Sequence, residues 1–291
     1  MAGTVALALL AGCAASAQSL GSAMRAAFAG QRGAAVVVRV RDRRVVASYG
    51  DRLLRLRVAT PGSAVKPFVL ELLLQQGAVK PDEAIACRRG LMIAGRRLQC
   101  SHPEELQSFR AEDALAWSCN SYFTAAAARL RLGELERRFG ELGFTRASGL
   151  MEGEGSGRVR PAVTPAEQQL LGVGAAGVQV TPLELASAYV GLAKMDPQNA
   201  PTADRVVLAG LRGAAEYGLA RGAAVPQLAV AGKTGTASDP GEAQTHAWFA
   251  GFAPAEKPEI VVVVFVERGT GSVEAAGIAH KIFSAYAGQR R

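Results

Sequence analysis

A serine and a lysine three residues apart stand where a long apolar helix begins. They are Ser63 and Lys66 in the stretch "PGSAVKPF", in a chain that has far more arginine than lysine. On a helix, residues three apart project from one face. The free N–H groups of the first turn favour developing negative charge. Burial lowers the pKa of a lysine toward neutrality, and a neutral amine beside a hydroxyl is a general base for a serine nucleophile. The same serine and lysine at this spacing could also be a helix-capping serine and a lysine whose amine reaches solvent, with no role in catalysis.

Two further elements carry hydroxyl, amide and amine groups. Ser118 and Asn120 precede the helical run "SYFTAAAARL", where a serine or an asparagine also serves as an ordinary helix cap. Residues 232–236, "GKTGT", follow the apolar run "QLAVA", and a strand lysine followed by hydroxyls can hold a carboxylate against the backbone. "GKT" also ends the phosphate-binding P-loop, but that pattern needs a glycine at the position of Gln227, so the P-loop is excluded.

Taken together, the three elements resemble the S-x-x-K, S-x-N and K-T-G set of penicillin-binding proteins and serine β-lactamases. Their order along the chain and their expected settings agree with that set: a helix start, a helix edge and a strand. Longer stretches resemble the transpeptidase domain of penicillin-binding proteins in particular, over roughly residues 31–287. These stretches are "PGSAVKPF", "ALAWSCNSYF", "VQVTPLELASAY", "AGKTGTAS" and "HAWFAGFAP".

The resemblance implies roles in acyl transfer for the first two elements. Ser63 is expected to be the acylated nucleophile and Lys66 its general base. Ser118 is expected to relay a proton to the leaving amine. Asn120 is expected to orient Lys66 and to hold the substrate amide.

The strand element is expected to bind the substrate. By the same resemblance, Lys233 tunes the electrostatics, and Thr234 and Thr236 bind the terminal carboxylate. Gly235 lets the substrate lie along the strand. Backbone N–H groups of Ser63 and Thr236 are expected to form the oxyanion hole, a contribution of a few kcal/mol per donor.

The implied function is that of a serine D,D-transpeptidase or D,D-carboxypeptidase. It would act on the D-Ala-D-Ala ends of peptidoglycan stem peptides, and β-lactams would inhibit it covalently. No cofactor is expected. Two alternatives stay open: a serine β-lactamase, although no E-x-x-L-N-like segment lies between Asn120 and Lys233, and a β-lactam sensor. The motifs do not distinguish transfer to an amine from transfer to water.

The elements that must position these residues can be read from the hydrophobic pattern. Two β-branched runs at 34–40 and 44–49 predict a hairpin. The last third of the chain predicts strands in "QLAVAGKTGT", "THAWFAGFAP" and "PEIVVVVFVE", followed by a final helix. Thr164 and Thr181 each begin a T-P-x-E capping box. The predicted fold is therefore α/β of the α+β kind: one mostly antiparallel sheet built from both chain ends, with helices on both faces and a helical lobe.

Composition points away from nucleic acid. The net charge of +8 comes from arginines scattered in ones and twos, without a basic run. Residues 1–17 contain a small apolar stretch that predicts a signal peptide or lipoprotein signal, and Leu10–Cys13 resembles a lipobox in which Cys13 would be lipidated. Residues 18–30 are expected to be a linker. These features predict an exported protein in the periplasm or on the outer face of the envelope, attached to a membrane only through this N-terminal segment.

In an exported chain, two cysteines are left for a disulfide. Cys13 is assigned to the lipobox and Cys119 lies inside the S-x-N element, so Cys87 and Cys100 are predicted to pair. The short loop they close would give a stabilisation of about 3 kcal/mol in the chain-entropy model. No metal site is predicted, since only His102 is close in sequence and the spacing does not match a zinc motif.

Overall fold

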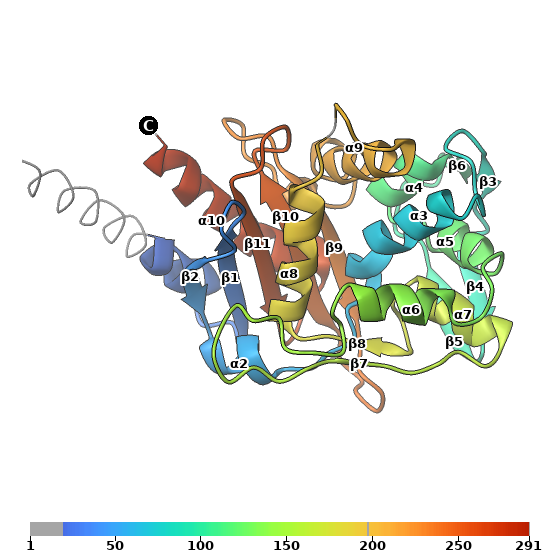
Figure 1. Ribbon diagram of the computed structural model, residues 1–291, viewed down its shortest axis with the longest axis horizontal. Coiled ribbons are helices and arrows are strands. Elements are labelled where there is room, and N and C mark those ends of the chain that lie inside the picture. The colour runs from blue at the N-terminus through green and yellow to red at the C-terminus, as the bar shows by residue number, and fades with distance from the viewer. Residues whose placement is uncertain (1–19, 197, 291) are drawn as a thin grey trace, which may run out of the picture.

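In the computed structural model, described for residues 20–196 and 198–290, a central sheet is flanked by helices on both faces (Figure 1). The sheet has five strands in the order β2-β1-β11-β10-β9, and every neighbouring pair is antiparallel. The strand bounds are β1 Gly33–Arg39, β2 Val45–Tyr49, β9 Ala231–Ala237, β10 His246–Ala253 and β11 Ile260–Val266. The predicted hairpin is thus confirmed, and it pairs with the C-terminal strands as expected.

The sheet is buried on both faces at its centre because β11, "IVVVVFV", is apolar at every position. Alternate residues of a strand point to opposite faces. Val261 and Val263 accordingly belong to the core on one side, and Val262 and Val264 to the core on the other. This arrangement explains why β11 lacks the polar alternation of a half-exposed strand.

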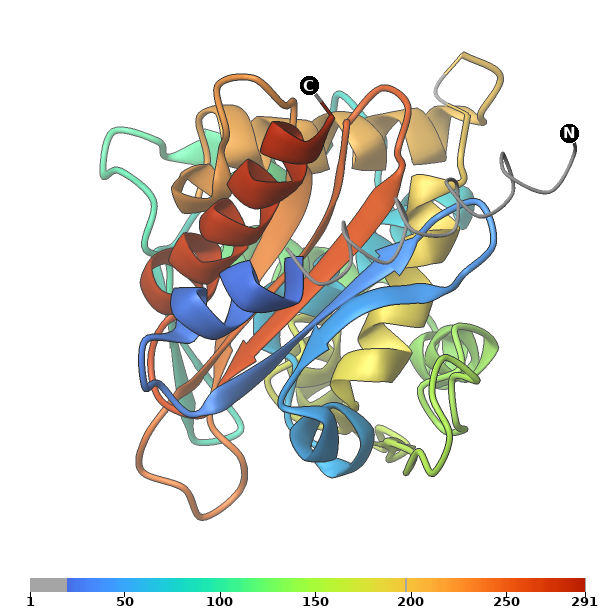
Figure 2. The same cartoon turned by 90° about the vertical axis from the view of Figure 1, so that its left-hand side faces the viewer.

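One face of the sheet is covered by the two ends of the described chain (Figure 2). Helix α10 (Ala276–Gln289) packs there beside a helix over residues 20–28. Leu20, Met24 and Phe28 of the second helix are buried in the same core. Most of the segment predicted as an 18–30 linker is therefore part of the folded domain, because its apolar residues recur at helical spacing and cover the sheet.

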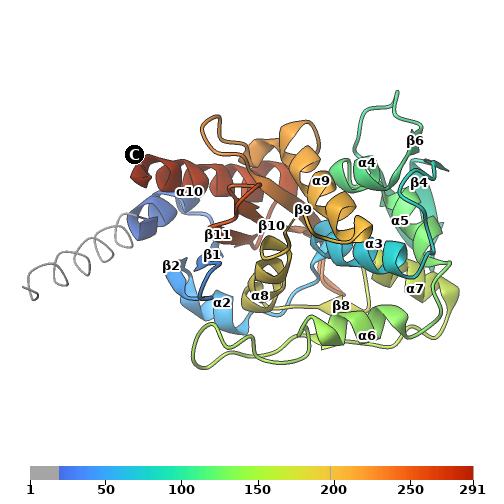
Figure 3. The ribbon, with the colours of Figure 1, turned by 45° about the horizontal axis from the view of Figure 1, so that its top comes forward.

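The other face carries α8 (Pro182–Ala193) and a lobe of helices (Figure 3). The lobe and its neighbours comprise α2 Asp51–Leu56, α3 Lys66–Gln75, α4 Ala111–Ala116, α5 Asn120–Ala127, α6 Glu134–Glu141, α7 Pro165–Gly172 and α9 Thr202–Glu216. Both predicted capping boxes are present, at Thr164 and Thr181. No helix in residues 20–196 and 198–290 is long and apolar enough to cross a membrane.

Short elements complete the chain, and several of them border the site described below. Three two-stranded sheets pair β3 with β6, β4 with β5, and β7 with β8. Their bounds are β3 Ile85–Ala86, β4 Gly90–Ile93, β5 Arg96–Gln99, β6 Ser108–Phe109, β7 Arg158–Val159 and β8 Val178–Gln179. Single-turn helices are η1 (Gly62–Val65), η2 (Arg221–Ala223) and η3 (Gly271–Ala275), the last of the π type.

Candidate active site

Ser63 lies on the 3-10 turn η1, directly before α3, and not inside the long helix itself. The turn begins at Gly62, whose φ of 53° is in the left-handed region that favours glycine. The backbone N–H of Lys66 donates to the carbonyl of Ser63, which joins the turn to the helix. The predicted helix start is thus confirmed in position, and the tighter turn leaves the half-buried Ser63 side chain facing a cleft.

Lys66 is fully buried, and its amine is held by the neighbouring loop. Nζ donates to the Ser118 carbonyl at 2.8 Å and to Asn120 Oδ1 at 2.7 Å, and lies 3.3 Å from Ser118 Oγ. It also lies 4.9 Å from the centre of the Phe123 ring. Burial lowers the pKa of Lys66 to about 8, against the opposing effect of the nearby Cys119 and Cys100. A proton-accepting amine near neutral pH is the property that a general base requires.

The loop between α4 and α5 is shaped to present both of its polar groups to Lys66. Ser118 has a φ of 56°, an uncommon conformation for a residue with a side chain. This conformation turns the carbonyl and the hydroxyl of Ser118 toward the same amine. Asn120 begins α5, and its Nδ2 donates to the carbonyl of Gln99 at 2.8 Å. The S-x-N loop is therefore fixed on one side by Lys66 and on the other by β5.

The K-T-G element forms the opposite wall. Strand β9 is at the edge of the sheet, so one side of its backbone is not paired with another strand. Lys233 is buried, and its Nζ donates to the Thr234 carbonyl at 3.1 Å. Burial, followed by the charge of Lys66, lowers the pKa of Lys233 well below its usual value. The structure thus brings the two lysines of the sequence motifs into one electrostatic neighbourhood.

Close backbone packing explains the glycines of the site. A Cβ on Gly235 would lie 2.4 Å from the carbonyl oxygen of Pro61, so the absence of a side chain lets η1 approach the strand. The contact seats the η1 turn against the strand, and the predicted role of Gly235 in substrate access stays a prediction. A Cβ on Gly174 would similarly lie 2.2 Å from the Gly62 carbonyl oxygen. The Gly62 N–H donates to the Gly174 carbonyl at 3.0 Å.

A cleft of about 450 Å³ opens between these walls, next to a second hollow of about 330 Å³. Both are lined by Ser63, Asn120 and Thr236, together with Arg97. Thr236 Oγ1 accepts a hydrogen bond from the Gly271 N–H at 2.8 Å, which leaves its own hydrogen free to donate. Among the described residues that line these two hollows, no side chain is a carboxylate.

Comparison with known proteins agrees with this geometry. Residues 33–285 match the family described as the penicillin binding protein transpeptidase domain. The chain belongs to this family. The chain is 28% identical to the stage V sporulation protein D of Bacillus subtilis over 257 residues, 75% of this chain and 39% of that protein. A structure of the corresponding domain of penicillin-binding protein 3 from Burkholderia pseudomallei superposes with a TM-score of 0.80 at 25% identity. The superposition covers 94% of this chain and 93% of that one.

A shorter part of this chain is similar to a peptidoglycan D,D-transpeptidase. Over 57 residues, 19% of this chain, the domain is 44% identical to the peptidoglycan D,D-transpeptidase PbpA of Mycobacterium tuberculosis. That match covers 12% of PbpA, so the matched regions span well under half the length of either curated relative.

The sequence interpretation of the transpeptidase domain missed Asp239. Its Oδ1 accepts from the N–H and the hydroxyl of Thr60, each at 2.8 Å, and from Gln179 Nε2 at 2.8 Å. Arg57 Nη2 lies 2.9 Å from Oδ2. Burial acts to raise the pKa of Asp239, but these hydrogen bonds outweigh it and the pKa is lowered overall. Asp239 therefore ties the end of β9 to the segment that leads into Ser63.

The Cys87–Cys100 disulfide predicted from the sequence is not formed in this structure. Cys87, Cys100 and Cys119 are free, and the Sγ atoms of Cys87 and Cys100 lie 3.7 Å apart. Cys119, which the sequence interpretation set aside with the S-x-N motif, lies with its Sγ 3.9 Å from that of Cys100, so three thiols meet where two were expected. Cys13 and the predicted signal lie outside the described residues.

Proposed function

We propose that this domain is a serine acyl transferase, a D,D-transpeptidase or D,D-carboxypeptidase acting on D-Ala-D-Ala ends of peptidoglycan stem peptides. The observation that carries the proposal is the buried amine of Lys66, whose pKa is about 8, held by Ser118 and Asn120 one turn from Ser63. The similarity to PbpA, a peptidoglycan D,D-transpeptidase, supports the same substrate class. The site of action would be outside the cytoplasm, where peptidoglycan lies.

In the acylation step, Ser63 Oγ attacks the carbonyl carbon of the penultimate D-alanine, and its proton passes to neutral Lys66. The N–H groups of Ser63 and Thr236 would stabilise the oxyanion of the tetrahedral intermediate. The proton then passes from Lys66 through the Ser118 hydroxyl to the leaving nitrogen. The C–N bond breaks, D-alanine departs and an ester to Ser63 remains.

Substrate binding would use the carboxylate of the terminal D-alanine. Thr236 has a hydroxyl hydrogen free to donate, and Thr234 and Lys233 lie on the same strand. Arg97 at the mouth of the cleft adds positive charge. An acceptor amine or a water then attacks the ester, takes the acyl group and returns the proton to Ser63.

A β-lactam would react at the same serine, but its leaving group stays attached to the acyl group. Hydrolysis then needs a water activated by a base, which is typically worth about two to four orders of magnitude in rate. Of the described residues lining the cleft, none carries a carboxylate for that purpose. We therefore expect the penicilloyl ester on Ser63 to last minutes to hours, unlike the ester in a β-lactamase.

The test is labelling with a fluorescent penicillin, a chase with unlabelled drug, and product analysis on a pentapeptide ending in D-Ala-D-Ala. The proposal predicts a stable label together with release of D-alanine or a transfer product. Loss of the label within seconds with steady nitrocefin turnover would make the protein a β-lactamase. A stable label without any reaction of the pentapeptide would contradict the proposed enzyme activity and favour a β-lactam sensor.

A further inference from the structure

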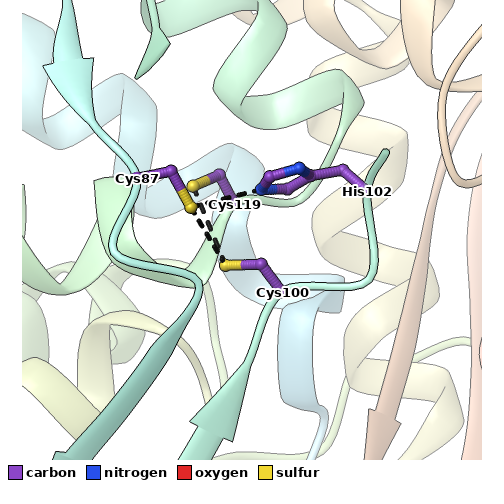
Figure 4. Close-up of side chains that lie close together, drawn as sticks. All are labelled: Cys87, Cys100, His102 and Cys119. Atoms are coloured by element: carbon purple, nitrogen blue, oxygen red, sulfur yellow. Dashed lines mark hydrogen bonds between the residues drawn. The ribbon is translucent and has the colours of Figure 1, made fainter. Parts of the chain in front are cut away.

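Four metal-binding side chains meet beside the S-x-N loop, although three separate segments supply them (Figure 4). Cys87 follows β3, Cys100 and His102 follow β5, and Cys119 is the N-cap residue of α5. The ligand atoms of all four lie within 4.8 Å of one another. His102 and Cys119 are buried, at 2% and 0% exposure.

The spacing of these atoms matches a tetrahedral zinc site. With Zn–S bonds of about 2.3 Å, two sulfurs at tetrahedral corners lie ~3.8 Å apart, and a sulfur and a nitrogen ~3.6 Å apart. The Sγ of Cys100 lies 3.7 Å from that of Cys87 and 3.9 Å from that of Cys119. The Sγ of Cys87 lies 3.3 Å from Nε2 of His102. The cluster needs only small movements to enclose the ion.

The surroundings of His102 prepare one nitrogen for a metal. Nδ1 lies 3.0 Å from the Pro103 carbonyl oxygen, which would accept the proton in the tautomer protonated at Nδ1. The Arg89 Nη1, a donor only, lies farther from Nδ1, at 3.4 Å. That tautomer leaves the lone pair on Nε2, the nitrogen that faces Cys87. A metal-bound histidine usually donates its other N–H to such an acceptor. The ring also packs edge-on against Phe109, with centroids 4.6 Å apart, and this contact holds its plane.

Two of the sulfurs accept backbone N–H groups, as thiolates do. The N–H of Arg89 lies 3.3 Å from Cys87 Sγ, and that of Tyr122 lies 3.4 Å from Cys119 Sγ. The second donor belongs to the first turn of α5, whose positive end favours a thiolate. The Arg89 guanidinium bonds the His102 carbonyl at 3.0 Å and brings a positive charge to the side of the cluster.

We propose that Cys87, Cys100, His102 and Cys119 bind one Zn²⁺ ion. Four protein ligands fill a tetrahedral site, so the role is structural, because a catalytic zinc keeps a position open for water or substrate. The sequence predicted no metal because only His102 is close in the chain to Cys87 and Cys100, and because Cys119 was assigned to the S-x-N motif. Only the fold brings it to the other three.

The zinc would position the catalytic loop. Cys119 lies between Ser118 and Asn120, and Cys100 follows Gln99, whose carbonyl accepts from Asn120. One ion would thus join β5 to the loop that holds the Lys66 amine. This positioning role rests on the proposed function, whereas binding of the metal does not.

The experiment uses the chain expressed with zinc and purified under reducing conditions without chelator. We expect about one zinc per chain by elemental analysis. After exchange of the zinc for Co²⁺, the protein should show the visible bands of a tetrahedral ion and thiolate charge-transfer absorption.

His102→Ala and Cys87→Ser should lower the zinc affinity by about tenfold or more. The matched control variant His280→Ala should retain the affinity of the parent chain. Less than a tenth of a zinc per chain with no cobalt spectrum in the parent chain would overturn the proposal. A Cys87–Cys100 disulfide in place of metal, found by peptide mapping, would do the same.

A second measurement separates this proposal from the proposed function. Ser63→Ala should keep its zinc and lose the penicillin label. Removal of zinc by a chelator should slow penicillin acylation of the parent chain by about tenfold or more, and added Zn²⁺ should restore the rate. Acylation that is unchanged in verified zinc-free protein would refute the positioning role. The zinc content of Ser63→Ala shows whether that variant keeps the site, and the chelator experiment uses the parent chain alone.

Discussion

In the proposed mechanism, replacing Lys66 with arginine keeps the positive charge but removes the base that accepts the serine proton. Burial lowers the pKa of Lys66 from 10.5 to about 8, so about one amine in ten is neutral at pH 7. A guanidinium stays protonated throughout this pH range and offers no lone pair for the serine proton. Lys66→Arg should therefore slow acylation at least ~100-fold, within the range of general-base effects.

The assay is the second-order rate of labelling by a fluorescent penicillin between pH 6 and 9.5. For the parent chain, the rate should rise about tenfold per pH unit below the pKa of Lys66 and level off above it, because only the neutral amine accepts the serine proton. Lys281→Arg, a change on α10 away from the cleft, is the matched control and should keep the parent rate. A folded Lys66→Arg chain that acylates within about threefold of the parent would refute the reasoning, because a loss of ~100-fold is expected.

Three further changes test the walls of the site. Gly235→Ala would place a Cβ 2.4 Å from the Pro61 carbonyl oxygen. It should lower the free energy of unfolding by about 1–3 kcal/mol and slow acylation. The control Gly277→Ala, which has open space around its Cβ position, should not destabilise the protein. Asp239→Asn should lower the melting temperature at pH 7. Because the pKa of Asp239 is lowered in the folded protein, the difference in melting temperature between variant and parent should shrink as the pH falls through the carboxyl range. A difference that does not change with pH would contradict this reasoning. Thr236→Val should raise KM for a pentapeptide substrate and Thr236→Ser should not; equal KM values would remove this hydroxyl from carboxylate binding.

Much of the site could be predicted because each motif carries its own local structure. A proline-glycine turn before an apolar run places Ser63 and Lys66 at a helix start, and an apolar run before Lys233 predicts a strand. The β-branched runs likewise predicted the sheet. The 3-10 geometry at Ser63 could not be predicted, since it depends on Gly62 packing against the Thr236 carbonyl, a contact made across the fold.

The residues that sequence reasoning missed are those whose partners are distant in the chain. Asp239 has no local motif of its own, and its hydrogen-bond partners include Thr60 and Gln179, 179 and 60 residues away. The sequence paired Cys87 with Cys100 because a short loop between two cysteines is sufficient to suggest a disulfide. Long-range packing, which sets the position of Cys119, has no signal in spacing.

The most direct test of the central claim is the intact mass of the protein after incubation with penicillin, followed by peptide mapping of the adduct. The claim is that Ser63 alone is acylated, because Lys66 serves as its base in a cleft between the S-x-N loop and β9. It predicts one added penicillin per chain, located on the peptide that contains Ser63 and absent from Ser63→Ala. An adduct of the same stoichiometry in folded Ser63→Ala would contradict it.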